Sequence, residues 1–297
     1  MIKESGKEKL FDIFNISYMI IFLLVIVVPL LYIVVNSFVS LEESSRRAVI
    51  IIPEKLDLTA YNLILFGSTD IISGYTITLF RTIVGVSLNM LFSCFVAYIL
   101  SRRDLPFRNI ITMYLFITIM FGGGLIPYYV VAIATGMQNN IWVYIIPGLI
   151  SVWNVLLLRN FMMEIPESIN ESAEIDGANQ VYILFKLIIP LSVPSLVTIA
   201  LFYAVGHWNS WFDAYLFMTD ANKFPVQLIL RNILITAQLN MSDLKGSQLE
   251  EMMRNARPSE RSIQNAAVVV STLPIVCVYP FIQKYFVKGI MVGSVKG

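Results

Sequence analysis

The side chains that could perform chemistry or bind a metal are few and scattered in this chain. It has two cysteines, Cys94 and Cys277, both within apolar runs, and one histidine, His207. Zinc sites need three or four Cys, His or carboxylate ligands together, so we expect no metal site and interpret the cysteines as small buried side chains. No GxxxxGK[ST] phosphate loop is present, so no catalytic residue or bound cofactor is expected. If ATP and Mg²⁺ are used, another polypeptide must bind them.

A second set of polar residues lies within or beside apolar sequence. Polar side chains at membrane depth are disfavoured by lipid and tend to mark a solute pathway. The candidates are His207, Trp208, Asn209, Asp213, Asn89 and Asn154. Each has a plainer interpretation: the tryptophan as part of an interfacial aromatic belt, and Asn89 and Asn154 as interhelical hydrogen-bond partners.

The composition determines the environment in which these residues must be placed. Of 297 residues, 57% are hydrophobic and 14% are charged, whereas soluble domains carry about 25% charged residues. A mean hydropathy of +0.73 leaves too little polar surface for a water-soluble globule. The net charge of +1 gives no reason to expect a nucleic-acid partner. The chain is therefore predicted to be an integral membrane protein in contact with lipid.

Apolar runs long enough to cross a bilayer predict an all-α, polytopic fold with six transmembrane helices. The first run is too long for a signal peptide and no A-x-A-like cleavage site follows it, so it is expected to remain as a helix. The Pro and Gly residues within the runs are expected to kink them, with a hinge at Gly122–Gly124 as an alternative. The six runs are 16–38, 76–100, 110–134, 141–161, 182–218 and 266–286.

The distribution of basic residues predicts the orientation. Lys and Arg near span ends are retained in the cytoplasm, and the short loop 136–140 at the opposite ends has no charge. Both termini are therefore predicted to be cytoplasmic, in a multi-pass protein of the cell (cytoplasmic) membrane. The residues on the predicted cytoplasmic ends are Lys3, Lys7, Lys9, Arg102, Arg103, Arg108, Arg159, Lys186, Lys284, Lys288 and Lys296.

The loop between the fourth and fifth runs, residues 163–179, has the pattern of a short helix. Ser168 and Glu171 have the spacing of a capping box, and Gly177 suits the helix end. A helix this short is marginal alone, so something must hold it. Ile169, Ala173 and Asp176 share one side, which favours either contact with a partner protein or a connector lying on the membrane surface.

The same loop carries a family resemblance. Glu171-Ser172-Ala173, Gly177 and Pro190 have the spacing of the EAA loop of importer permeases, and residues 171–196 are similar to maltose-transporter-type carbohydrate ABC permeases. This resemblance implies an ABC type I importer permease fold, with a coupling helix near 168–179 inside a permease domain at 76–297. Residues 1–75 would form an N-terminal tail, the first transmembrane helix and an extracellular loop. The implied ATPase-coupling residues are Glu171, Ser172, Ala173, Asp176, Gly177 and Ala178, with serine at 172 where the motif usually has alanine.

The resemblance also implies partners and a substrate. The partners would be a second permease subunit in a heterodimer, a cytoplasmic ATPase dimer that binds ATP and Mg²⁺, and an extracellular solute-binding lipoprotein docked at Ser242 to Ser262, which is otherwise interpreted as a disordered loop. The segment 121–129, FGGGLIPYY, looks like Gram-positive permeases for oligosaccharides and aldouronates. Trp208 and Asn209 would suit the apolar faces and hydroxyl edges of a saccharide.

Two other functional classes remain open from the residues alone. An ion-coupled secondary transporter needs ionisable residues in mid-span, and the runs offer only Arg81 near an outer end and Asp213 near an interface. An ABC permease for a non-sugar solute, or a non-transporting assembly subunit or sensor, would show the same runs. In each of these readings the chain itself carries out no bond chemistry.

Overall fold

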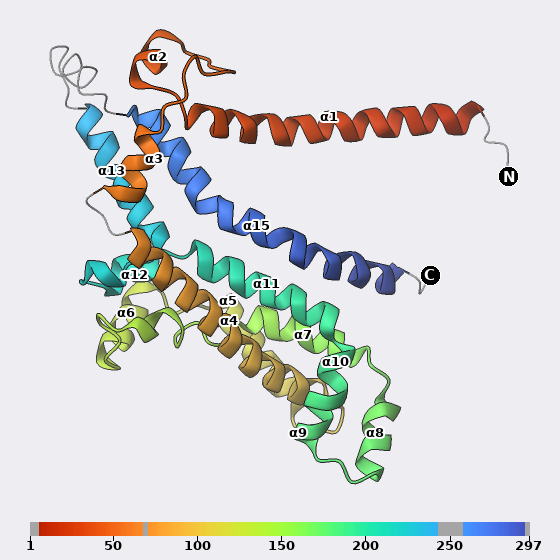
Figure 1. The fold of residues 1–297 in the computed structure, drawn as a ribbon. Helices are drawn as coiled ribbons and strands as arrows, with labels where there is room; N and C mark the ends of the chain where they lie inside the picture. The colour runs from red at the N-terminus through yellow and green to blue at the C-terminus, as the bar shows by residue number, and fades with distance from the viewer. Residues whose placement is uncertain (1–5, 68–70, 243–257, 295–297) are drawn as a thin grey trace. The chain divides into compact units, whose positions relative to one another are not determined.

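The computed structural model describes residues 6–67, 71–242 and 258–294, and within these residues the regular secondary structure is helical (Figure 1). The chain divides into two compact units, one of residues 1–71 and 230–275 and one of 72–229 and 276–297. The predicted division into residues 1–75 and 76–297 stays a prediction. Residues 230–275 belong to the same unit as the N-terminal residues, which sequence patterning did not predict.

In the first unit, an unbroken apolar helix leads into a short folded segment. Helix α1 (Gly6–Asn36) exposes most of its large apolar side chains, as expected for a helix surrounded by lipid. After it come α2 (Leu41–Arg46) and α3 (Thr59–Phe66). The Asn36 amide donates to the carbonyls of Tyr32, at 2.8 Å, and Ile50, at 3.1 Å. These bonds fold the segment after α1 back against the end of the helix.

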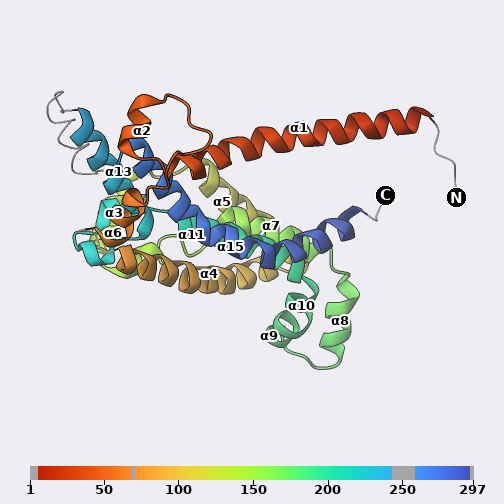
Figure 2. The same ribbon diagram turned by 45° about the horizontal axis from the view of Figure 1, so that its top comes forward.

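In the second unit, α4 (Ile71–Ser101) and α11 (Val193–Asn209) lie side by side, as both ribbon views show (Figures 1 and 2). The buried hydroxyls of Ser93 and Tyr203 join them at 2.7 Å. Their buried apolar side chains form one core with α7 (Val152–Met163), the end of α9 (Gln180–Ile183) and the π-helical turn η2 (Leu184–Ile188). The other helices of this unit are α5 (Arg108–Met120), α6 (Leu125–Ala134), α8 (Glu167–Ile175), α10 (Ile189–Leu191) and α12 (Phe212–Phe217).

Long apolar helices confirm the helical membrane fold, although the expected number of six spans is not reached by unbroken helices. Within the described residues, three helices are long and apolar enough to cross a bilayer: 9–36, 71–101 and 260–280. The predicted third run is instead a pair, α5 and α6, bent by 110° at the Gly122–Gly124 segment. The predicted fifth run is bent by 88° between α10 and α11, next to Pro190 and Pro194. The count of six spans stays a prediction.

The predicted fourth run, 141–161, is not one helix. It forms a single turn, η1 (Ile141–Tyr144), then irregular backbone, then α7. Pro147 has no amide hydrogen, so it cannot continue a helical hydrogen-bond ladder, and Gly148 weakens the helix further. The Asn89 amide donates to the carbonyls of Gly148, at 2.8 Å, and Leu149, at 2.7 Å. The freed backbone groups of this break are therefore satisfied by a side chain of α4.

Replacing Asn89 with leucine tests this role. The two carbonyls would lose their donor in a water-poor environment, which we expect to lower the free energy of unfolding by about 1–3 kcal/mol. The measurement is thermal unfolding of the purified protein in detergent. Ser87→Ala on the same helix removes only an exposed bond to Ile83 and should change stability by less than about 0.5 kcal/mol. Equal unfolding temperatures for the two variants would contradict the assignment.

Candidate functional site

The polar loop predicted to form a short helix contains α8, which projects with α9 beyond the ends of α4 and α7 (Figures 1 and 2). It begins at Glu167, directly after Pro166, which is the N-cap residue and has a non-helical ψ of 131°. Ser168 therefore lies inside the helix instead of at its cap, and no side chain caps this end. The predicted capping box of Ser168 and Glu171 is wrong for this reason.

The end of α8 agrees with the sequence prediction. Gly177 has a φ of +82°, a left-handed conformation that costs other residues about 1–2 kcal/mol. The amide of Ala178 donates to the carbonyl of Ala173 at 2.9 Å, and that of Gly177 to Glu174 at 3.0 Å. These bonds satisfy carbonyl groups that the helix end would otherwise leave free.

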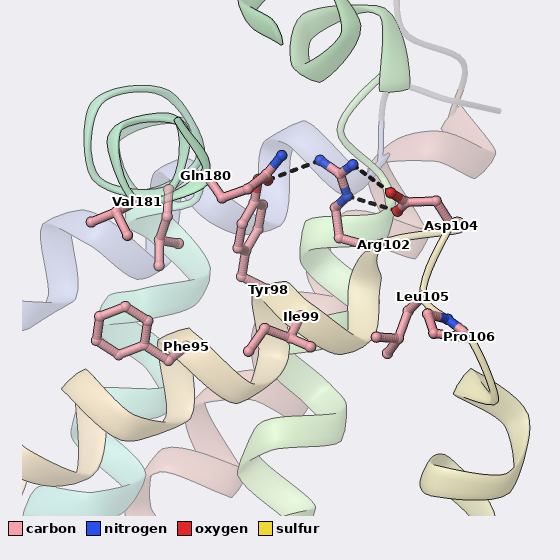
Figure 3. Close-up of a pocket in the computed structure, with 10 residues that line it drawn as sticks. Phe95, Tyr98, Ile99, Arg102, Asp104, Leu105, Pro106, Gln180 and Val181 are labelled. Carbon is pink, nitrogen blue, oxygen red and sulfur yellow. Dashed lines mark hydrogen bonds and ion pairs between the residues drawn. The ribbon is translucent and has the colours of Figure 1, made fainter. Parts of the chain in front are cut away.

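Charged side chains from the end of α4 hold α8 in place. Arg102 Nη1 lies 2.5 Å from Glu174 Oε1, while its Nε and Nη2 bind the two carboxylate oxygens of Asp104 at 2.8 and 2.7 Å. Gln180 joins the group: its Oε1 accepts from Arg102 at 3.0 Å and from the Tyr98 hydroxyl at 2.7 Å (Figure 3). Hydrogen bonds from Arg102 lower the pKa of Glu174 and of Asp104. Both carboxylates stay ionised above their ordinary pKa of about 4, and the contribution of the contacts is lost only as the pH falls through the lowered values.

A second ion pair and two alanines also hold α8. We call the contacts of Arg102 and Arg103 with Glu174, Gln180 and Glu167 the brace. Arg103 Nε lies 3.3 Å from Glu167 Oε2, seven residues before Glu174 and thus on the same side of the helix. Ala173 and Ala178 pack against the apolar core of the unit. Two of the predicted coupling residues therefore contact the chain's own core, while the opposite side of α8 is free. Exposed residues away from the brace include Ser172, Ile175, Asp176 and Gly177, with Ile175 86% exposed. Glu171 is also exposed, but it lies between Glu167 and Glu174 on the side that faces Arg102 and Arg103.

An apolar cavity of about 360 Å³ lies beside the brace. Its walls include Phe95 and Ile99 of α4 and Val181 of α9, and the Tyr98–Gln180–Arg102 hydrogen bonds lie along one side (Figure 3). The brace and the apolar cavity are therefore next to each other, at the end of α4.

A second cavity, of about 350 Å³, lies among α4, α6, α11, α12 and the broken segment before α7. Its central charges are Arg81, 2% exposed, and Asp213, whose Oδ2 lies 2.6 Å from Arg81 Nη2 and whose Oδ1 lies 3.2 Å from Nη1. The Tyr144 ring centroid is 4.6 Å from the guanidinium carbon. A buried charge pair stabilises only while both partners are present, because removal of one leaves an uncompensated charge. The cavity wall is therefore polar without a net charge from this pair.

The predicted pathway residues separate into three groups around this second cavity. His207, Asp213 and Asn154 line it. Asn89 is buried behind it, with its Oδ1 2.7 Å from His207 Nε2. Trp208 and Asn209 do not line it: the tryptophan is buried with its ring 6.4 Å from that of Tyr75, and the Asn209 amide donates to the Val205 carbonyl. Their role in the pathway stays a prediction.

Sequence patterning missed several cavity residues because their partners are distant in the chain. Arg81 was noted only as an ionisable residue near a span end, and its partner Asp213 lies 132 positions later. Tyr203 lines the cavity and its hydroxyl accepts from the Ser151 amide at 3.1 Å, yet a tyrosine in an apolar run has no distinguishing sequence signal.

Most of the predicted docking segment, Ser242 to Ser262, lies outside the described residues, which omit 243–257. At its end, Ser259 and Ser262 are buried, and the Ser262 hydroxyl donates to the Val39 carbonyl at 2.6 Å. These two side chains contact the chain's own first unit. Docking through the remainder stays a prediction.

Comparison with known proteins gives relatives along nearly the whole chain, although no family model matches it. It is 40% identical over 292 residues, 98% of this chain and 100% of the relative, to the polygalacturonan/rhamnogalacturonan transport system permease protein YtcP of Bacillus subtilis. It is 36% identical to protein LplC of the same organism over 97% of this chain and 96% of the relative. It is 26% identical to the arabinooligosaccharides transport system permease protein AraQ of Halalkalibacterium halodurans over 91% of each.

A solved structure has a closely similar fold. It is a bacterial ABC transporter involved in the import of the acidic polysaccharide alginate, with a TM-score of 0.82 and 29% identity, covering 96% of this chain and all of the matched chain. The chain belongs to the family of permease subunits of carbohydrate ABC importers. It is thus a multi-pass membrane protein and a transport permease subunit.

The close approach of α4 and α11 at Gly85 can be tested by adding one methyl group. A Cβ at this position would lie 2.5 Å from His207 Nε2, so Gly85→Ala must displace the imidazole and break its bond to Asn89. We expect a loss of about 1–3 kcal/mol in stability, measured by thermal unfolding in detergent. In Gly85→Ala/His207→Ala the clash is absent, so the double variant should be no less stable than His207→Ala alone. Additive losses would contradict the contact.

The brace predicts a local effect of removing Glu174. Glu174→Ala deletes the contacts to Arg102 and Gln180, and exposed ion pairs of this kind contribute little to global stability. We therefore expect faster amide hydrogen exchange in α8 without a change in global unfolding temperature. Ser172→Ala, on the exposed side of the same helix, is the control and should not speed up exchange. Equal exchange in both variants would show that the brace does not hold α8.

Proposed function

We propose that this permease moves an acidic oligosaccharide inward by alternating access, and that the exposed side of α8 is the surface through which a separate ATPase drives it. The observation that carries the proposal is the asymmetric environment of α8. One side is fixed to the end of α4 by Arg102 and Arg103, and the other presents Ile175 and two predicted coupling residues, Ser172 and Asp176, to solvent.

This asymmetry suits a helix that transmits force. A nine-residue helix with no side-chain cap at its start is marginal alone, so its ordering requires the tertiary contacts that it makes with α4. An isoleucine that is 86% exposed on so polar a helix is costly unless a partner covers it. Ser172, Asp176 and Gly177 lie near it in the helix and its end, and they supply the polar rim typical of protein interfaces.

The substrate class is supported by the relatives and by the second cavity. Two of the similar proteins belong to systems named for polygalacturonan/rhamnogalacturonan and for the acidic polysaccharide alginate. The cavity combines tyrosine rings, which suit the apolar faces of sugar rings, with the amide of Asn154 and the imidazole of His207. Trp208 and Asn209 remain proposed contributors through movement of α11.

The remaining parts of the proposed importer would be other chains. We expect a second permease subunit in a heterodimer, a cytoplasmic ATPase dimer that holds ATP and Mg²⁺, and an extracellular solute-binding lipoprotein that docks on part of 242–262. Both termini would face the cytoplasm, in the cytoplasmic membrane. The basic residues at the end of α4 support that orientation, because Arg102, Arg103 and Arg108 lie together near α8.

Reconstitution of the complete transporter in liposomes tests the proposal. With the binding protein outside and ATP inside, uptake of a labelled oligogalacturonate should depend on ATP and should exceed uptake of a neutral oligosaccharide of equal length. Uptake that follows a proton or sodium gradient without ATP would indicate a secondary transporter. ATP-dependent uptake of only neutral saccharides would overturn the acidic substrate class while leaving the importer assignment intact.

Ile175 provides the sharpest test of coupling. Ile175→Asp places a charge at the centre of the proposed interface, where a desolvated unpaired carboxylate costs several kcal/mol, so uptake should fall by about a hundredfold or more. ATP hydrolysis should no longer respond to the loaded binding protein. Ile175→Leu keeps the apolar contact and should retain uptake within about twofold. Normal coupling in the aspartate variant, with subunits assembled, would rule out this surface.

A further inference from the structure

The four arginines at the end of α4 divide into two pairs with different electrostatic surroundings. Arg102 binds Asp104 and Glu174, and Arg103 binds Glu167. A further carboxylate, Glu171, lines the same small pocket as Arg102 and Arg103. The other pair, Arg108 at the start of α5 and Arg159 in α7, has no ion pair with any carboxylate in the described part of the chain.

Arg108 and Arg159 instead contact backbone oxygens at the end of α4. Arg159 Nε donates to the Leu100 carbonyl at 3.1 Å, and Arg108 Nη1 approaches the Arg102 carbonyl at 3.5 Å. Each of these contacts uses one nitrogen of the arginine's guanidinium group, so both side chains have further N–H donors. The two cations lie close enough to repel each other, and both side chains are half-buried. Two like charges held together in partial burial favour an anion between them.

The surroundings of this arginine pair indicate the kind of anion. The pair lies where the long apolar helix α4 ends, which is the depth of lipid headgroups for a membrane-spanning helix. The adjoining surface of α5 is apolar and exposed, with Phe107, Ile110, Met113 and Tyr114 facing outward. The apolar surface of α5 suits the acyl chains of a phospholipid, and the two neighbouring guanidinium groups suit its phosphate.

We propose that Arg108 and Arg159 form a binding site for the phosphate group of one anionic phospholipid. The planar guanidinium groups would donate paired hydrogen bonds to the phosphate oxygens while the acyl chains lie along α5. A net negative headgroup is favoured over a zwitterionic one, because two positive charges lack any described carboxylate partner. The site is separate from the exposed side of α8 and from the cavity around Arg81.

Native mass spectrometry of the intact transporter, purified from nanodiscs of phosphatidylglycerol and phosphatidylcholine, tests the site. The wild-type complex should retain phosphatidylglycerol through progressive delipidation. The variant Arg108→Gln/Arg159→Gln should retain roughly tenfold less, because it loses charge-assisted contacts to the phosphate. Arg46→Gln, which removes an exposed arginine paired only with Glu42, is the matched control and should retain the wild-type amount.

Two further arms keep the lipid assignment falsifiable. If the double variant assembles poorly, each single glutamine variant should show an intermediate loss, and titration of wild type with inorganic phosphate should fail to displace the lipid. Equal retention in wild type and variants would overturn the site. Binding of inorganic phosphate with no retained lipid, or equal retention of phosphatidylcholine, would overturn its assignment to an anionic phospholipid.

Discussion

The structure depends on one constraint: in a medium without water, each backbone amide and carbonyl needs a partner within the protein. The second unit meets this constraint where its chain is not helical. At the break around Pro147, the Asn89 amide supplies donors to two carbonyls, and the Tyr203 hydroxyl accepts from the amide of Ser151. Irregular backbone can therefore line a cavity next to α4 and α11. The helices that satisfy the break are also the helices that carry the cavity's polar side chains.

The charged groups of the second unit fall into environments with different energetic consequences. Arg81 and Asp213 form a buried pair whose integrity requires both partners, whereas the pairs that hold α8 are largely exposed and individually weak. The strong pair keeps the cavity neutral and fixes its shape. The weak pairs let α8 stay ordered yet yield to a binding partner at little energetic cost. The ion pair that stabilises the cavity and the ion pairs that can yield to a partner of α8 thus lie at opposite ends of the unit.

Sequence patterning predicted the features that local physical chemistry determines. Apolar runs revealed the membrane helices, and Gly177 marked the end of α8 because only glycine adopts its conformation without strain. The break at Pro147 was visible as a proline, but whether it kinks or interrupts a helix depends on Asn89, which lies 59 positions before Gly148. The Arg102–Glu174 contact likewise joins residues 72 positions apart. Pairings of this kind follow from the tertiary fold and have no local signal in a single sequence.

The uninterrupted course of α4 connects the two ends of the unit mechanically. Asn89 and Arg102 lie thirteen residues apart, which corresponds to about 20 Å along a helix. The hydrogen-bond ladder between them contains no proline, so this stretch resists bending. A displacement of α8 that moves Arg102 would therefore tilt or shift α4 as a rigid helix and move Asn89 with it. The broken segment, whose Gly148 and Leu149 carbonyls accept from Asn89, would then be displaced with it.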